Sequence, residues 1–130
     1  MTSRLALIMT GLAGMIWLIS PISAAERQPF DASAFAAAQQ QGKSIVIHVS
    51  APWCPTCKAQ HSIIDGLTAR PDFKDVAVFE IDFDTAGANL RKFNARSQST
   101  LIGFKGASET SRSVGDTSKS GIDALFKSTL

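Results

Sequence analysis

Two short apolar segments constrain the fold of this chain more than any other feature. The first is SIVIHVS, residues 44–50, and the second is VAVFEIDF, residues 76–83. The first is nearly continuous in apolar residues and rich in β-branched ones, which is typical of a strand buried on both faces. The second predicts another strand. A chain with such strands must cover both faces of a sheet with helices.

The rest of the chain supplies helical patterns and one hairpin. We predict helices over 31–42, 54–69, 86–94 and 118–130, and a hairpin from strands 99–105 and 111–115. Asp31 is placed to cap the first helix and Gly42 to end it. The order helix, strand, helix, strand, helix, hairpin, helix predicts an α/β sandwich, with a mixed central sheet and helices on both faces.

Residues 1–25 carry the pattern of a removable secretory signal peptide. One basic residue, Arg4, precedes an apolar run over residues 5–20, and small residues follow it. The alternative is an uncleaved membrane anchor, but this run of 16 residues is shorter than the roughly 20 that a spanning helix needs. We therefore expect cleavage after Ala24 or Ala25 and export to the periplasm or another extracytoplasmic compartment.

The remaining chain, residues 26–130, is expected to form a single domain. Its 105 residues are enough for one modest core. Its charge is nearly balanced, with 12 basic and 11 acidic residues. No basic run interleaved with aromatic residues indicates nucleic-acid binding. Outside the reducing cytosol, disulfides can persist.

Cys54 and Cys57, the two cysteines of the chain, stand in the segment SAPWCPTCK, residues 50–58. They come where the first apolar strand has ended and a helix begins. Free backbone N–H groups and the positive end of the helix dipole favour a thiolate there, and Lys58 adds a cation. Pro55 suits the first helical turn because that position needs no N–H donor. Such settings can lower a cysteine pKa from about 8.5 to 7 or below, which favours a redox role.

Two other roles for the pair stay open at this point. A disulfide across so short a loop stabilises by only about 2 kcal/mol, so a purely structural bridge would do better between distant segments. A metal-handling site could use Cys54, Cys57 and His61, since His61 lies four residues after Cys57 on the same helix face. Structural zinc would want a fourth ligand, and the only other histidine is His48 in the strand.

The segment SAPWCPTCK resembles the active-site segment of thioredoxin-like proteins, in which Trp-Cys-x-x-Cys-Lys begins a helix after a buried strand. STLIGFKGASE, from residue 99, is similar to the family's Pro-Thr-Leu segment and Phe-Lys-x-Gly hairpin. VGDTSKSGIDALF, from residue 114, resembles its closing Val-Gly turn and last helix. The match covers most of residues 30–130. It implies a thioredoxin-like three-layer sandwich and a thiol–disulfide oxidoreductase.

The resemblance also implies a role for each residue of the motif. Cys54 would be the exposed nucleophile that attacks a partner disulfide, and Cys57, more buried, would resolve the mixed disulfide. Trp53 would form part of the contact surface, while Pro55 and Thr56 would tune the redox potential. Cys54 and Cys57 would alternate between dithiol and disulfide, and no cofactor or resident metal is expected.

Two ionisable residues depart from the family pattern within the predicted strands. Thioredoxins carry an aspartate beneath the second cysteine, where this chain has His48, and a lysine on the next strand, where it has Glu80. We expect His48 and Glu80 to pair under the site with the charge signs exchanged, and His48 to assist deprotonation of Cys57. A hydrogen-bonded core histidine and a surface glutamate are the alternative.

The position facing the cysteines departs as well. The family places a cis-proline directly before the threonine of Pro-Thr-Leu, and this chain has Ser99 before Thr100. Because a cis bond without proline costs about 3 kcal/mol, we expect a trans bond between Gln98 and Ser99. Gln98, Ser99 and Thr100 are expected to line the substrate groove, and the loss of proline would alter its shape.

The sequence therefore predicts an exported thiol–disulfide oxidoreductase that exchanges disulfides with partner proteins, more as a reductase than as an oxidase. A membrane protein is a candidate electron donor, and we expect a monomer. One alternative is a metal-handling module such as a copper carrier, although copper-delivery proteins of this fold usually supply a downstream histidine and none follows His61 here. A non-catalytic interaction domain is the other, given Ser99.

Overall fold

A five-stranded mixed sheet organises residues 27–130, the part of the chain that this computed structural model describes. The predicted signal peptide, residues 1–25, lies outside the described residues. The elements in chain order are β1 (Arg27–Pro29), α1 (Ala32–Gln40), β2 (Ser44–Ser50), α2 (Pro55–Thr68), the 3-10 turn η1 (Pro71–Phe73), β3 (Ala77–Asp82), α3 (Gly87–Lys92), β4 (Thr100–Lys105), β5 (Ser108–Val114) and α4 (Lys119–Ser128).

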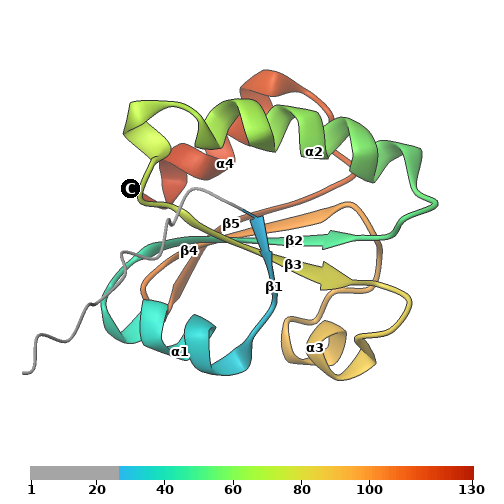
Figure 1. The fold of residues 1–130 in the computed structure, drawn as a ribbon, viewed down its shortest axis with the longest axis horizontal. Coiled ribbons are helices and arrows are strands. Elements are labelled where there is room, and N and C mark those ends of the chain that lie inside the picture. The colour runs from blue at the N-terminus through green and yellow to red at the C-terminus, as the bar shows by residue number, and fades with distance from the viewer. Residues whose placement is uncertain (1–26) are drawn as a thin grey trace, which may run out of the picture.

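The strands lie in the order β1-β3-β2-β4-β5. The first three are parallel, β4 runs antiparallel to β2, and β5 runs antiparallel to β4. Helices α2 and α4 cover one face of the sheet, and α1 and α3 cover the other (Figure 1). This arrangement confirms the predicted α/β three-layer sandwich.

Strand β2 divides its side chains between the two helical layers. Ile45, Ile47 and Val49 belong to the apolar core beneath α1 and α3, and Val46 belongs to the core beneath α2 and α4. Side chains alternate along a strand, so His48 points to the α2 side together with Val46. All residues of β2 are buried, as the apolar run predicted.

Strand β3 obeys the same alternation. Phe79 and Ile81 pack in the core beneath α1 and α3, whereas Val78 packs beneath α2 and α4. Glu80 therefore faces α2 as well, and it lies opposite His48 in the register of β2 and β3. Two ionisable side chains thus meet under the helix that begins at the cysteines.

The first residues of helices α1 and α4 are set by capping side chains. The side chain of Asp31 accepts a hydrogen bond from the backbone N–H of Ala34, 2.7 Å away, and so begins α1. Ser118 caps α4 in the same way. The amphipathic pattern of the last helix is confirmed, because it buries Ile122, Leu125 and Phe126.

One strand was not predicted from the sequence. β1 has only three residues, among them an arginine and a proline, and so shows no apolar alternation. It forms because the edge of β3 offers it a parallel partner. Its position matters, since it carries Arg27 to Glu80.

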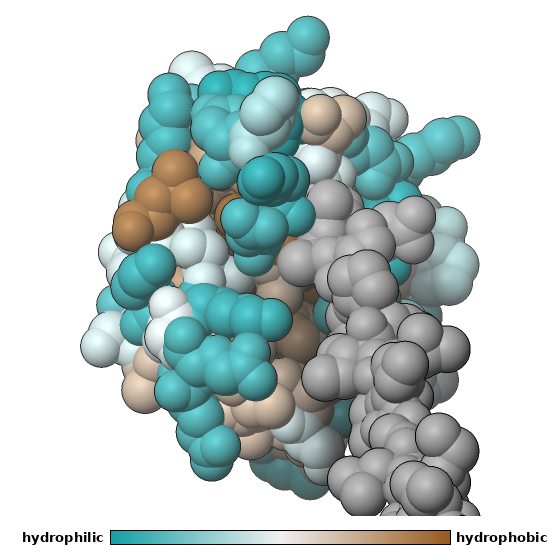
Figure 2. All heavy atoms as spheres, turned by 60° about the vertical axis from the view of Figure 1, so that its left-hand side comes forward, coloured by the Kyte–Doolittle hydropathy of each residue, from teal (hydrophilic) through white to brown (hydrophobic). Residues whose placement is uncertain are grey.

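The surface is mainly polar where it is visible. On the face that Figure 2 shows, hydrophilic side chains predominate and strongly hydrophobic ones form a small, separate spot. Among the described residues, the large apolar side chains that are exposed are those of Trp53, Val114 and Leu130. No helix described between residues 27 and 130 has the length and apolar character to cross a membrane.

Candidate active site

Cys54 and Cys57 form a disulfide at the start of α2. Cys54 is the N-cap residue, and its sulfur accepts a hydrogen bond from the backbone N–H of Cys57, 3.1 Å away. Pro55 occupies the first helical turn, Thr56 is half-buried, and Lys58 lies exposed one turn into the helix. The free end of the helix backbone therefore points at the sulfur of Cys54, as the sequence predicted.

Cys54 is less open to solvent than the sequence led us to expect. In the disulfide form the residue is 5% exposed, and Cys57 is fully buried. Both cysteines pack with Ala51, and the partly buried ring of Phe83, the residue that follows β3, packs against this cluster. The expected order of exposure holds, with Cys54 the nearer of the two to solvent.

Ser99 lies against both sulfurs. Its hydroxyl oxygen is 3.2 Å from the sulfur of Cys54 and 3.1 Å from that of Cys57. No cis peptide bond occurs in the described part of the chain, so the Gln98–Ser99 bond is trans as expected. The φ of Ser99 is 61°, in the left-handed region, which a serine seldom adopts.

Backbone hydrogen bonds hold Ser99 in this conformation. Its N–H donates to the carbonyl of Val49, 2.8 Å away, and its carbonyl accepts from the N–H of Gly115, 2.9 Å away. Thr100 does not line an open groove as predicted, because it is buried and its hydroxyl donates to the carbonyl of Ser97. Gln98 stays half-buried at the surface.

Trp53 is the exposed aromatic residue beside the disulfide, with an exposed fraction of 58%. Its indole N–H donates to a carboxylate oxygen of Asp84, 2.8 Å away. Asp84 was not predicted from the sequence, although it follows β3 just as Trp53 follows β2. The carboxyl ends of neighbouring parallel strands meet at one edge of the sheet, and this was the available signal.

His48 is fully buried and bonds to Gln60 rather than to Glu80. Its Nε2 lies 2.9 Å from the side-chain oxygen of Gln60. The Gln60 nitrogen donates to the carbonyls of Ser99 and Asp116. The Gln60 oxygen must therefore accept, so that Nε2 of His48 carries the hydrogen and Nδ1 is left as an acceptor.

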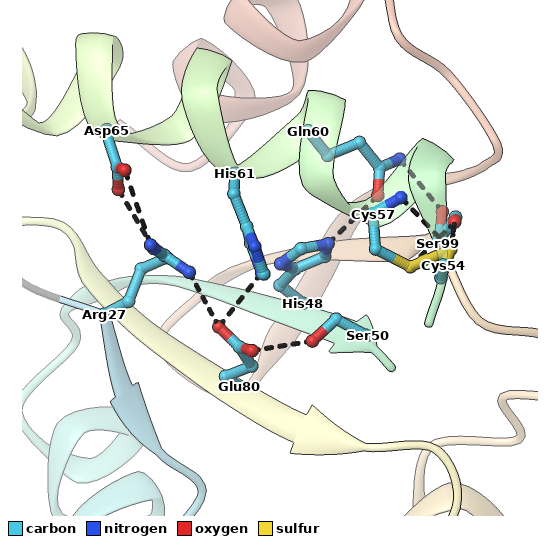
Figure 3. A network of polar contacts seen from close by, with 10 residues as sticks. All are labelled: Arg27, His48, Ser50, Cys54, Cys57, Gln60, His61, Asp65, Glu80 and Ser99. Atoms are coloured by element: carbon cyan, nitrogen blue, oxygen red, sulfur yellow. Dashed lines mark hydrogen bonds and ion pairs between the residues drawn. A yellow bond between two sulfur atoms is a disulfide. The ribbon is translucent and has the colours of Figure 1, made fainter. Parts of the chain in front are cut away.

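The burial of His48 favours its neutral form. Removal from water lowers the pKa of His48 from 6.5 to about 4, against the opposing effect of its bond to Gln60. The imidazole is therefore neutral at physiological pH. His48 was predicted to act as a base toward Cys57, but its Nε2 is hydrogen-bonded to Gln60 instead (Figure 3). Gln60 itself was not anticipated, since one polar residue within a helical pattern carries no specific signal.

Glu80 gathers partners from three elements. Its Oε1 accepts from the hydroxyl of Ser50 at 2.6 Å, and its Oε2 lies 3.1 Å from the Arg27 guanidinium and 3.3 Å from Nε2 of His61. Burial works to raise the pKa of Glu80, but the Ser50 hydrogen bond and the nearby positive and imidazole groups hold it below its ordinary value. The predicted direct bond between His48 and Glu80 is not made; the two are cross-strand neighbours.

His61 turns away from the cysteines. It faces Glu80, and its ring stands perpendicular to that of His48, with 4.8 Å between the ring centroids. In the described part of the chain, Cys54, Cys57 and His61 therefore do not assemble the metal site that their spacing suggested. The cluster that could hold an ion there consists of His48, His61 and Glu80.

Comparison with known proteins agrees with the fold and the disulfide. The family model described as Thioredoxin matches residues 27–128. This chain belongs to the thioredoxin family. The family resemblance, the fold and the thiol–disulfide oxidoreductase activity inferred from the sequence are thereby confirmed at the level of the family.

Individual relatives support the same assignment. The crystal structure of Trxlp from Edwardsiella tarda EIB202 is 38% identical, with a TM-score of 0.75, and the match covers 78% of this chain and 98% of that one. Thioredoxin Asp f 29 of Aspergillus fumigatus is 29% identical over 65% of this chain and 78% of its own length. A thioredoxin of Chlamydia trachomatis is 31% identical over 64% and 76%.

Proposed function

We propose that this thioredoxin-family protein is exported and reduces disulfides of partner proteins through Cys54 and Cys57. The observation that carries the proposal is the placement of Cys54 at the N-terminus of α2, where its sulfur accepts the N–H of Cys57. The exposed ring of Trp53 stands next to it and offers a partner an apolar contact beside the reactive bond.

The exchange proceeds in two substitutions at sulfur. In the reduced protein the Cys54 thiolate attacks one sulfur of the partner disulfide, which forms a mixed disulfide and releases the other partner sulfur as a thiolate. The Cys57 thiolate then attacks the sulfur of Cys54 and releases the second partner thiolate. The partner gains two electrons and two protons, and Cys54 and Cys57 are left as the disulfide seen in the structure.

The surroundings of Cys54 favour its thiolate both as nucleophile and as leaving group. The N–H of Cys57 donates to the sulfur, and the hydroxyl of Ser99 lies within hydrogen-bond distance. Hydrogen bonds to the charged form lower the pKa of a thiol. A thiol of low pKa departs faster when a mixed disulfide resolves.

Export and the electron donor complete the proposal. The signal-peptide pattern of residues 1–25 supports export. In the extracytoplasmic compartment, a membrane protein with its own dithiol would reduce the disulfide again, and the protein would act as a monomer. N-terminal sequencing of the protein recovered outside the cytoplasm tests this part. A mature chain that begins at Ala25 or Glu26 is the expected result, and an intact Met1 terminus would contradict it.

The redox direction is tested with the fluorescence of Trp53. In a Trp17→Phe variant, Trp53 is the single tryptophan, and its emission is followed across a glutathione redox series. We expect one two-electron transition with a potential near that of thioredoxin, about −270 mV, and no transition in a matched variant in which Cys54 and Cys57 are both replaced by serine. A potential near −120 mV, typical of a strong oxidant, would refute the reductase assignment.

A further inference from the structure

Three side chains that suit a metal ion converge beneath the disulfide, on the α2 side of the sheet. They are His48 from β2, His61 from α2 and Glu80 from β3, and their ligand atoms all lie within 4.8 Å of one another. We propose that they form a binding site for a divalent transition-metal ion of the class that prefers imidazole ligands, with Zn²⁺ as its probe. The site is separate from the two cysteines and independent of their disulfide exchange.

The first observation is an unpartnered nitrogen in the protein interior. His48 is fully buried, and its Nδ1 has no hydrogen-bond partner. The bond from Nε2 to Gln60 fixes the hydrogen on Nε2, so that Nδ1 presents a lone pair. Buried polar atoms of proteins almost always have a hydrogen-bond partner. A metal ion bound by the lone pair of Nδ1 would supply the partner that this atom lacks.

His61 supplies a second such nitrogen. Its Nε2 lies 3.3 Å from Oε2 of Glu80, but the contact does not have the geometry of a hydrogen bond, and this buried atom also has no hydrogen-bond partner. Metal bonds of about 2.1 Å in a tetrahedron separate ligand atoms by about 3.4 Å. His61 and Glu80 already meet that spacing, and His61, with a side chain that is 27% exposed, has room to turn toward His48.

Outer partners hold two of the three ligands in place. Gln60 accepts from the far nitrogen of His48 at 2.9 Å, and Ser50 donates to the Glu80 oxygen that points away from His61 at 2.6 Å. Metal-binding histidines and carboxylates typically have such hydrogen bonds, which fix the tautomer and orientation of the ligand. The pattern in Figure 3 matches this arrangement.

A groove gives an ion access to the cluster. It has a volume of about 700 Å³, and His61 and Glu80 both line it. Asp65 and Asp82 line it as well, so that it carries three carboxylates against the single guanidinium of Arg27. The excess of negative charge favours a cation, and the groove leaves room for water or a substrate group as a fourth ligand.

Arg27 is the cation that a metal ion must compete with. Its Nη1 lies 3.1 Å from Oε2 of Glu80, while its Nε binds Asp65 at 2.9 Å. Asp65 can retain the guanidinium when the ion takes the Glu80 oxygen. Removal of the Arg27 guanidinium should therefore strengthen the binding of the metal ion, whereas removal of His61 or Glu80 should weaken it.

The test is titration of the oxidised full-length protein with Zn²⁺ by calorimetry, because cysteines held in a disulfide do not act as thiolate ligands. We expect saturable binding of one ion per chain. His61→Asn and Glu80→Gln should each weaken it by at least about 100-fold. Arg27→Gln should strengthen it about tenfold.

Matched controls separate this cluster from its surroundings. Asp75→Asn removes an exposed carboxylate that does not line the groove and should leave the affinity within a few-fold of wild type. Circular dichroism checks that each variant is folded, and Co²⁺ should give visible bands without the sulfur-to-cobalt charge-transfer band. Absence of stoichiometric binding, or equal affinity in wild type and His61→Asn, would overturn the proposal.

Discussion

The hydroxyl of Ser99 lies 3.2 Å from the sulfur of Cys54, at the position where a proline faces the cysteines in the family pattern. A proline has no hydrogen-bond donor on its side chain, whereas serine has one. The same hydroxyl is 3.1 Å from the sulfur of Cys57. In the reduced protein it can therefore donate to whichever sulfur carries the negative charge.

Ser99→Ala should make the protein more reducing. A hydrogen bond to a charged group is worth about 1.5 to 3 kcal/mol, and this bond stabilises the reduced form. Since about 30 mV corresponds to 1.4 kcal/mol for a two-electron couple, we expect the potential to fall by about 30 mV or more. Glutathione titration of Trp53 fluorescence measures the shift.

Ser99→Gly is the matched control for the backbone. It also removes the hydroxyl, so its potential should fall by the same amount. Glycine accepts the positive φ of this position without strain, and the Gly variant should therefore be about 1 kcal/mol more stable than the Ala variant in urea unfolding. A shift in the Ala variant alone would assign the effect to the backbone and not to the hydroxyl.

Gln60→Leu should destabilise the protein by about 3 kcal/mol or more. The change leaves the Nε2–H of His48 and the carbonyl of Asp116 without the hydrogen bond from Gln60, and each such loss costs about 1 to 3 kcal/mol. The carbonyl of Ser99 loses one of its two hydrogen bonds and keeps that from the N–H of Gly115. Urea unfolding measures the difference. Gln40→Leu, on the exposed side of α1, is the control and should change stability by no more than about 0.5 kcal/mol.

His48 should make stability depend on pH between about 4 and 6.5. Its pKa is lowered to about 4 in the folded protein from 6.5, with His61 from α2, Glu80 from β3 and Arg27 from β1 as the charged or titratable groups around it. Between these values the unfolded chain binds one proton more than the folded one, so stability falls as the pH falls.

The expected loss is about 3 kcal/mol across that window, at about 1.4 kcal/mol for each unit of the pKa difference. Above pH 6.5 the contribution of His48 is fully present. Chemical unfolding in the presence of a chelator, at several pH values, gives the profile. His48→Gln should lose this slope, and a slope equal to that of wild type would show that other groups cause it.

Asp84→Ala should release the Trp53 ring. The indole N–H loses its acceptor at 2.8 Å, so fluorescence anisotropy of Trp53 in the Trp17→Phe background should fall. Reduction of a protein disulfide should slow, whereas exchange with glutathione, which needs no extended contact surface, should not. Asp75→Ala, an exposed carboxylate elsewhere, should change neither rate.

The elements of this fold were predictable where apolar periodicity and capping residues coincide. The predicted strand at residues 44–50 matches β2, and the predicted helices match α1, α2 and α4 within a few residues. β1 was not predicted because its three residues, one of them proline, show no apolar alternation. They form a strand only through parallel pairing with the edge of β3.

The sequence predicted the residues of the site that belong to a motif or to a family position, but not the contacts between them. The motif placed Cys54 and Cys57 at a helix start, and the resemblance to the family's aspartate and lysine positions placed His48 and Glu80 under the site. Which polar atoms bond could not be read from the sequence. Gln60 and Arg27 reach the site from α2 and β1, and such long-range contacts have no local sequence signal.

The central claim is that Cys54 attacks and Cys57 resolves. It is tested most directly by reacting reduced Cys57→Ser and Cys54→Ser variants with a protein disulfide and measuring how fast each forms a mixed disulfide. The account predicts rapid formation of a stable mixed disulfide by Cys57→Ser, and a rate at least about 100-fold lower for Cys54→Ser, whose remaining thiol is fully buried. Equal rates, or faster reaction of Cys54→Ser, would contradict it.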